Sequence, residues 1–593
     1  MPRALSTPIL VAVLAAAAAR ALAAQATDDA IRVNQVGYLP DAPKVAVVCA
    51  LAPRAIAAFE VIDATGKRVF GPKKASPSGA FGPCAETYRL DFSALRAPGT
   101  YRVRAGDLTS PALTVGAKVW NGLADMPLRY MRQQRSGYNP VFDANLHTKD
   151  GIIVDHPTRA GEYLPASGGW ADASDYLQYV TTSATATFQM LQASRDHPRA
   201  FGDAYQADGR AGANGIPDVL DEARHGLVWL LKMFPDDSLM LNQLGDDRDH
   251  VGFEVPANDS SDYGWGPGGP RPLYPCTGMP QGLLRYQNRS SGYASTAGKF
   301  AAAFALGAQL LRSREPALAD TLQRKARAAF ALGEKYPGAC QGASARSPYF
   351  YEEEDWADDM ELGAAALYAL TANPRYAARS MTFAAQAKVK PWMGADTASH
   401  YQWFPFHNIG HYEAWRRGTP ALRTALASYY RDGLRAVLRR ADNGFRAGIP
   451  FIWCSNDLMT SLAVQAVLYR QMTGDTQFRE LEQSAIDWLF GVNPWGVSMV
   501  IGVPANGRFP QTPHSIVNLK LKLQLDGGLV DGPVYTSIYK NLAGISLTHA
   551  DAYAKWNTGF IVYHDDFGDY STNEPIIDGS VNVLFLLSTL ARP

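Results

Sequence analysis

The amino-acid sequence predicts a two-domain protein, a small all-β sandwich followed by a ring of paired α-helices. From residue 31 to about residue 115, short alternating apolar and polar runs are separated by turn residues, which is typical of strands. From residue 119 onward, apolar residues recur with the period of about 3.6 that indicates helices. We therefore expect a β-domain over residues 27–117 and a helical domain over residues 118–593.

The first 26 residues are typical of a secretory signal peptide. Arg3 precedes an apolar run over residues 9–19, and Ala21, Leu22 and Ala23 form a small-x-small cleavage site. No later stretch has the roughly 18 uninterrupted apolar residues of a membrane span. We expect a secreted or periplasmic protein that is free of the membrane after cleavage.

Composition excludes some partners and suggests one. The 56 basic and 56 acidic residues give a net charge of zero, which argues against binding to nucleic acid or to anionic membranes. The supply of 12 Trp and 28 Tyr suits rings that stack on sugars, although most such rings belong to cores. We expect a monomer with a carbohydrate partner.

The β-domain is predicted from strands near residues 44–49, 57–62, 68–70, 87–92, 99–103 and 112–115. Residues 63–67 and 97–99 have the composition of hairpin turns, so the spacing favours a sandwich of about 85 residues. The chain has five cysteines, so at most two disulfides can form. We consider Cys49 with Cys84 and Cys276 with Cys340, pairings that the sequence leaves open.

Twelve stretches of the second domain have helical periodicity. Short links, such as residues 372–373 and 473–475, require antiparallel neighbours, and six such hairpins suit a toroid better than an irregular bundle. Two long segments rich in Gly, Pro and aromatic residues, 245–287 and 491–569, interrupt the helices, and such loops are usually functional. The predicted helices cover residues 120–134, 176–193, 217–234, 293–311, 316–335, 357–371, 374–388, 405–415, 420–439, 457–472, 476–490 and 574–590.

Two acidic clusters, about 400 residues apart, each follow an aromatic loop and precede a predicted helix. Residues 168–176 contain Asp172 and Asp175, and residues 569–574 end in Glu574. Taken singly, each carboxylate could simply cap its helix. If the clusters share one rim of the toroid, they provide the two carboxyl groups, one protonated and one ionised, that glycosidic bond hydrolysis requires.

These clusters resemble the signatures of glycoside hydrolase family 9. Residues 168–176 are similar to the family pattern G-G-W/Y-x-D-A-G-D-Y, and residues 569–574 are similar to D-Y-x-x-N-E, with Asn582 where a downstream Asn is usual. Further segments resemble the family, and residues 32–40 resemble the start of the immunoglobulin-like module often fused before such enzymes. These segments are residues 134–137, 214–223, 249–250, 453–456, 491–494 and 510–514.

The resemblance implies an immunoglobulin-like sandwich before an (α/α)6 barrel that hydrolyses β-1,4-glucan with inversion. Asp175 would be the general base, Asp172 would help to hold the attacking water, and Glu574 would be the general acid. Inversion requires a carboxyl separation of about 6.5 to 9.5 Å. The substrate-binding residues that we expect are His514, Tyr570, Trp453, Trp170 and Tyr176.

The chain departs from the family pattern at several positions. Ser174 stands where the signature has Gly, and the arginine of the family run P-H-H-R is missing after His514, although Arg508 could replace it. Relatives often hold zinc through two Cys and two His, but Ser136 and Asn145 stand near the Cys positions beside His147 and His156. We expect that zinc site to be lost and no cofactor to be required. Calcium near Asp246, Asp247 and Asp249 is the minority alternative.

Three functions are compatible with the sequence. The first is an exported inverting hydrolase of cellulose-like or mixed-linkage β-glucan. The second is an exo-acting glucosidase or glucosaminidase on short oligosaccharides, which the missing arginine and the insertion at 245–287 favour. The third is a glycan-binding protein without catalysis, which would not need the three acidic residues.

Overall fold

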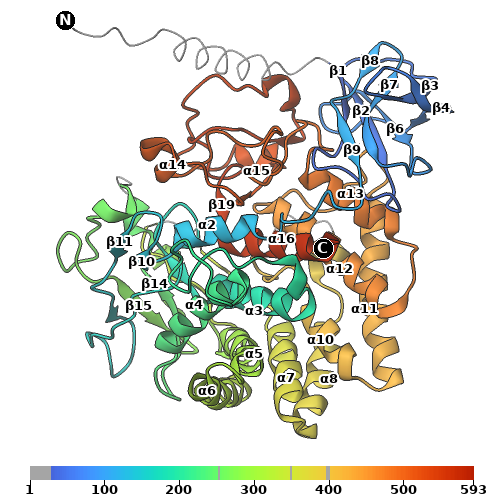
Figure 1. Cartoon of the computed structure of the whole chain (residues 1–593). Helices are drawn as coiled ribbons and strands as arrows, with labels where there is room; N and C mark the ends of the chain where they lie inside the picture. The colour runs from blue at the N-terminus through green and yellow to red at the C-terminus, as the bar shows by residue number, and fades with distance from the viewer. Residues whose placement is uncertain (1–28, 251–253, 283, 347–349, 396–400, 593) are drawn as a thin grey trace, which may run out of the picture.

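The computed structural model describes residues 29–250, 254–282, 284–346, 350–395 and 401–592. It consists of an N-terminal β-sandwich joined to a large helical domain (Figure 1). The fold class predicted from the sequence is confirmed. The predicted signal peptide lies outside the described residues. Among the helices that are described, none combines the length and the apolar composition of a membrane span.

The sandwich has two antiparallel sheets. One has the order β1-β2-β6-β5, and the other has the order β4-β3-β7-β8 with β9 paired to β7. Alternation places every second residue of a strand in the core, as the burial of Tyr101, Val103 and Ala105 along β7 illustrates. The strands are β1 (Asp29–Arg32), β2 (Val45–Ala50), β3 (Ala58–Asp63), β4 (Arg68–Lys74), β5 (Ser76–Pro77), β6 (Glu86–Asp91), β7 (Gly99–Ala105), β8 (Leu108–Thr109) and β9 (Leu113–Val115).

Twelve helices of nine or more residues occur among the described residues, one for each predicted helix. They are α2 (Met126–Gln134), α3 (Val180–Asp196), α4 (Asp218–Met233), α5 (Ala294–Leu311), α6 (Pro316–Lys335), α7 (Ala357–Thr371), α8 (Pro374–Ala387), α10 (Ile409–Arg417), α11 (Pro420–Arg440), α12 (Ser455–Thr473), α13 (Arg479–Leu489) and α16 (Ile577–Leu590). The short helices are α9 (Pro391–Gly394), α14 (Ile516–Leu521) and α15 (Thr536–Tyr539).

Six of these helices form an inner ring. Each helix contacts the next in the order α3, α5, α7, α10, α12 and α16, and α16 packs on α3 to close the ring. The other long helices pack outside it, each against a neighbour from the ring. The burial patterns agree, because α16 is buried along nearly its whole length whereas α6 buries one stripe.

The sandwich is fixed to the barrel through α13 and the loop that follows it (Figure 1). The side chain of Asn34 donates a hydrogen bond to Asp487 at 2.8 Å, and the backbone amide of Gln35 donates to the backbone carbonyl of Phe490 at 2.9 Å. Phe81 of the sandwich packs against Trp488 and other rings of the barrel. The sandwich and the barrel thus share a buried junction of polar and aromatic contacts.

Both disulfides considered from the sequence are formed, Cys49 with Cys84 in the sandwich and Cys276 with Cys340 in the barrel. Cys454 remains a buried thiol.

Candidate active site

The loop that carries Asp172 and Asp175 follows two glycines with positive φ. Gly168 has φ of 125° and Gly169 has φ of 73°, values that L-residues with a Cβ rarely adopt. A Cβ on Gly169 would also approach the ring of Trp229 to 2.6 Å. The turn therefore requires glycine at this point.

A buried ion pair holds this loop through Trp170. Arg135 donates two hydrogen bonds to Glu222, at 2.9 and 2.7 Å, and both side chains are buried. The indole N–H of Trp170 donates to the same carboxylate at 2.8 Å. Arg135 and Glu222 belong to two different motifs of the family resemblance, which the fold thus brings together under the acidic loop.

Trp170 corrects one expectation. We expected its ring to contact sugar, but the side chain is 0% exposed, with Glu222 on its N–H and His225 against its ring. Tyr176 is also buried at 5% exposure, and its hydroxyl donates to the carbonyl of Glu254. Both rings position the loop rather than presenting a face to a ligand.

A second arginine, which the sequence analysis missed, holds the far side of the loop. Arg271 is 2% exposed and pairs with Asp150 through bonds of 3.0 and 2.8 Å. The same guanidinium donates to the carbonyl of Tyr176 and to the side chain of Gln178. Arg271 lies in the 245–287 insertion, so that insertion helps to build the site.

Asp172 is buried and hydrogen-bonded on both carboxyl oxygens. The hydroxyl of Thr182 donates to Oδ1, and that of Tyr351 donates to Oδ2 at 2.8 Å. Burial raises the pKa of Asp172 to about 7, although these two hydroxyls oppose the shift. Its backbone carbonyl accepts the amide of Ile577, so the loop is tied directly to the start of α16.

Asp175 lies beside other charges. Burial, followed by the negative charge of Asp249, raises the pKa of Asp175 well above its usual range, and the positive charge of His250 opposes this. The Nε2 atom of His250 is 3.6 Å from a carboxyl oxygen of Asp175. Hydrogen bonding to Asp249 and the surrounding carboxylates raise the pKa of His250 to about 10 against the effect of burial, so its imidazole is positively charged at neutral pH.

Glu574 meets this loop from the other end of the chain. The amide of Ser174 donates to Glu574 Oε1 at 3.0 Å, and the Ser174 hydroxyl donates to the same oxygen. Glu574 therefore lies on the same rim as Asp175 rather than at the opposite mouth. Neither acid is a helix cap, because a short strand separates each from its helix, β13 (Gln178–Tyr179) before α3 and β19 (Pro575–Ile576) before α16.

A further acid, which the sequence analysis missed, lies beside Glu574. Asp531 follows the strand β16 (Leu529–Val530), which pairs with β19, and its amide donates to the carbonyl of Glu574 at 2.9 Å. Its carboxylate accepts the indole N–H of Trp453 at 2.8 Å and the thiol of Cys454 at 3.1 Å. Burial, followed by the charge of Glu574, raises the pKa of Asp531 well above its usual range.

Three of the expected sugar-binding rings come together beside these acids. Trp453 and Tyr570 have ring centroids 5.3 Å apart, and His514 lies 6.1 Å from Tyr570. All three side chains are partly exposed. The His514 Nδ1 atom donates to the carbonyl of Phe567, which fixes the orientation of the ring. Such a cluster can provide apolar faces and polar edges for a pyranose ring.

The structure also shows the surroundings of the missing arginine and of Arg508, its possible replacement. Ile516, at the place of the missing arginine, is buried at the start of α14. Arg508 lies near the sandwich, because its amide donates to Gln35 and its charge lowers the pKa of Arg32 in addition to burial. These contacts place Arg508 at the junction with the sandwich.

The residues considered for metals have other partners. His147 pairs with Asp259 at 3.0 Å, and His156 accepts the amides of Thr158 and Arg159.

The aspartates of the minority calcium alternative likewise accept hydrogen bonds from the protein. The donors are Arg248 and Tyr274 for Asp246, the backbone amides of residues 345 and 346 for Asp247, and His250 for Asp249. Over the described ranges, no group of three or more His, Cys, Asp or Glu side chains could hold a metal. Both sets of residues thus already have hydrogen-bond partners within the protein.

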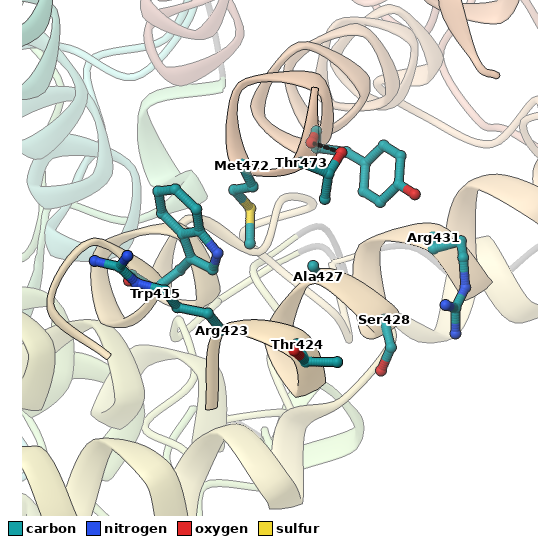
Figure 2. A pocket seen from close by; sticks show the side chains of 9 residues that line it. Trp415, Arg423, Thr424, Ala427, Ser428, Arg431, Met472 and Thr473 are labelled. Atoms are coloured by element: carbon teal, nitrogen blue, oxygen red, sulfur yellow. Dashed lines mark hydrogen bonds between the residues drawn. The ribbon is translucent and has the colours of Figure 1, made fainter. Parts of the chain in front are cut away.

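A surface hollow of about 350 Å³ lies elsewhere, among α10, α11 and the end of α12 (Figure 2). It is lined by Trp415, Arg423 and Thr473, among others, and Arg423 already bonds the carbonyls of residues 415 and 416. Thr473 ends α12, whereas Cys454 next to its first residue contacts Asp531. The 19 residues of α12 rise about 28 Å, so this hollow is separate from the acids.

Comparison with known proteins gives two family matches. The model of glycosyl hydrolase family 9 matches residues 120–587, and that of the cellulase N-terminal ig-like domain matches residues 26–110. Endoglucanase C of Cellulomonas fimi is 29% identical over 523 residues, which are 80% of this chain and 44% of that protein. The xyloglucan-specific endo-beta-1,4-glucanase BoGH9A of Bacteroides ovatus is 26% identical over 541 residues, 85% and 86% of the two chains.

Solved structures with the same fold include a metagenome-derived glycoside hydrolase family 9 endoglucanase. It is 26% identical, with a TM-score of 0.73 over 95% of this chain and 99% of its own. AaCel9A, solved in complex with a cellobiose-like isofagomine, has a TM-score of 0.71 at 23% identity over 95% and 99% of the two chains, which shows the shared fold.

Proposed function

The chain belongs to glycosyl hydrolase family 9, and from that premise we propose that it hydrolyses β-1,4-glucosidic bonds with inversion, in cellulose-like or mixed-linkage β-glucans. The observation that carries the proposal is the meeting of Glu574 with the loop of Asp172 and Asp175, through two hydrogen bonds from Ser174. Relatives named as endoglucanases support the same bond type.

In this mechanism Asp175 removes a proton from water while Glu574 protonates the leaving oxygen. Burial and the carboxylates around Asp175 strengthen it as a base, and the charged His250 keeps the ionised form accessible. Asp172, held by Thr182 and Tyr351, orients the water rather than receiving its proton. Trp453, Tyr570 and His514 bind the sugar next to the cleaved bond.

The test is to compare Asp175→Asn and Glu574→Gln with two matched controls, Asp262→Asn and Glu352→Gln. Each catalytic variant should lose roughly 10²- to 10⁴-fold in kcat on carboxymethyl cellulose or cello-oligosaccharides. Asp262 accepts a backbone amide in a surface turn, and Glu352 forms an ion pair with Arg289. The two control variants should therefore leave turnover unchanged. Full turnover by either catalytic variant would remove the assigned roles, and NMR of the first product anomer tests inversion.

Exo-action on short oligosaccharides is the second candidate, and one observation favours it. Glu254 of the insertion accepts the hydroxyl of Tyr176, next to Asp175, and its carboxylate pairs with Lys520 of α14. This tie joins two loops beside the base and would restrict a long chain there. Products from carboxymethyl cellulose, compared with those from cello- and chito-oligosaccharides, distinguish exo-action from endo-action and glucosidase from glucosaminidase activity.

We further propose that residues 1–26 direct export and are then removed, and that the protein acts as a monomer without a cofactor. The apolar run and cleavage site of the first 26 residues support export. N-terminal sequencing of the exported protein tests the cleavage, and its mass in solution tests the monomeric state. Activity that persists in the presence of a chelator tests independence from a metal cofactor.

A further inference from the structure

Ser174 makes a contact that the family signature does not encode. The signature has Gly at this position, and a glycine could donate only its backbone N–H. Ser174 donates that N–H to Glu574 Oε1 at 3.0 Å and adds its hydroxyl to the same oxygen. Ser174 does not adopt a positive φ, so the backbone here does not require glycine and accommodates the side chain.

We propose that Ser174 is a positioning residue for the general acid, selecting which oxygen of Glu574 delivers the proton. This inference rests on the proposed function. Two donors converge on Oε1, and the hydroxyl oxygen of a carboxylic acid is a poor acceptor for them. Oε1 is therefore the carbonyl-like oxygen, and the acidic proton is carried by Oε2.

The hydroxyl also contributes to the reaction itself. As the proton passes from Oε2 to the leaving oxygen, Glu574 becomes a carboxylate, and the bond from the Ser174 hydroxyl becomes charge-assisted. A bond that strengthens during proton transfer lowers the barrier more than it stabilises bound substrate. Its loss should therefore lower kcat rather than raise KM.

Four other titratable groups interact electrostatically with Glu574. They are Asp172 and Asp175 in the same loop as Ser174, Asp531 after β16, and Tyr130 in α2. Changes confined to Ser174 leave all of these groups in place. A difference between such variants and the wild type therefore isolates the hydroxyl.

The experiment uses the full-length protein with Ser174→Ala, Ser174→Gly and Ser174→Thr. The first two keep the backbone donor and lose the hydroxyl, whereas threonine retains one. On cello-oligosaccharides we expect kcat to fall roughly tenfold for the alanine and glycine variants, with KM changed less than twofold. The threonine variant should recover most of the rate, and thermal unfolding checks that all three are folded.

Two readouts separate positioning from a structural role. The alkaline limb of the pH–rate profile should move to higher pH in the alanine variant, because one donor to the ionised acid is lost. With 2,4-dinitrophenyl β-cellobioside, whose leaving group needs no proton, the alanine variant should equal the wild type. An unmoved alkaline limb, or equal losses on both substrates, overturns the inference while wild-type turnover still supports the proposed function. A wild type that cleaves neither substrate overturns both.

Discussion

Replacing Asp487 by asparagine should stabilise the protein at high pH and have a smaller effect at low pH. Asp487 is 3% exposed on α13, where its Oδ1 accepts Asn34 of the sandwich and Gln483, each at 2.8 Å. Burial raises its pKa to about 7, although the two amides and Arg89 oppose the shift. Asparagine keeps an oxygen for both amides and removes the buried charge.

The sign follows from proton binding. Because the folded-state pKa of Asp487 is above the ordinary value of about 3.9, the folded protein binds more protons than the unfolded chain between those two values. Stability contributed by this group is therefore fully present below about pH 4 and is lost as pH rises to about 7. The loss is about 1.4 kcal/mol per pH unit, so from pH 5 to 7 it is about 2.7 kcal/mol as an upper bound.

The assay is urea unfolding of the wild type and Asp487→Asn at pH 5 and pH 8, followed by tryptophan fluorescence. The difference in unfolding free energy should grow in favour of the variant by up to about 2.7 kcal/mol between these pH values. Asp442→Asn is the control, because that side chain is 94% exposed on the surface. A difference that does not change with pH, or a variant less stable at pH 8, would refute the reasoning.

Three further predictions concern the site. Trp453→Ala should lower kcat/KM on cello-oligosaccharides roughly 10- to 100-fold, since it removes a ring expected to bind sugar, and unchanged steady-state kinetics would exclude that contact. Asp531→Asn should move the alkaline limb of the pH–rate profile to lower pH, because it removes the negative charge that Asp531 places beside Glu574 once it ionises, and a shift to higher pH would contradict this. Trp170→Phe should lower the unfolding free energy by about 1 to 3 kcal/mol, because a buried hydrogen bond is lost, and leave KM unchanged, whereas a raised KM would restore the original sugar-contact expectation.

The fold was largely predictable because its signals are local. Periodicity located all the long helices of the described residues, and the errors lie at the boundaries, since α3 begins at Val180 and α16 at Ile577 rather than at residues 176 and 574. At both places a two-residue strand precedes the helix. Such a strand depends on pairing with a distant segment, β14 (Leu241–Leu244) or β16, and local propensity does not encode it.

The candidate site was predictable in its acids and less so in their surroundings. Asp172, Asp175 and Glu574 stood out because residue type and spacing matched a reaction and a family signature. Arg271 and Asp531 were missed because each lies in a loop without a motif and acts through contacts made only in the folded chain. Trp170 was misassigned because an aromatic residue beside the acids has the same sequence signal whether it binds sugar or supports the loop.

The position of the acids in the ring explains why the site needs the whole helical domain. The inner ring begins with α3 and ends with α16, and these two helices pack together, with Gln189 donating to Asn582 at 3.0 Å. Asp175 precedes α3 and Glu574 precedes α16, so the two acids lie on opposite sides of the seam that closes the ring. Their separation is therefore set by how α16 docks on α3. Any change that loosens this seam should disturb the acid and the base together, even where it touches neither side chain.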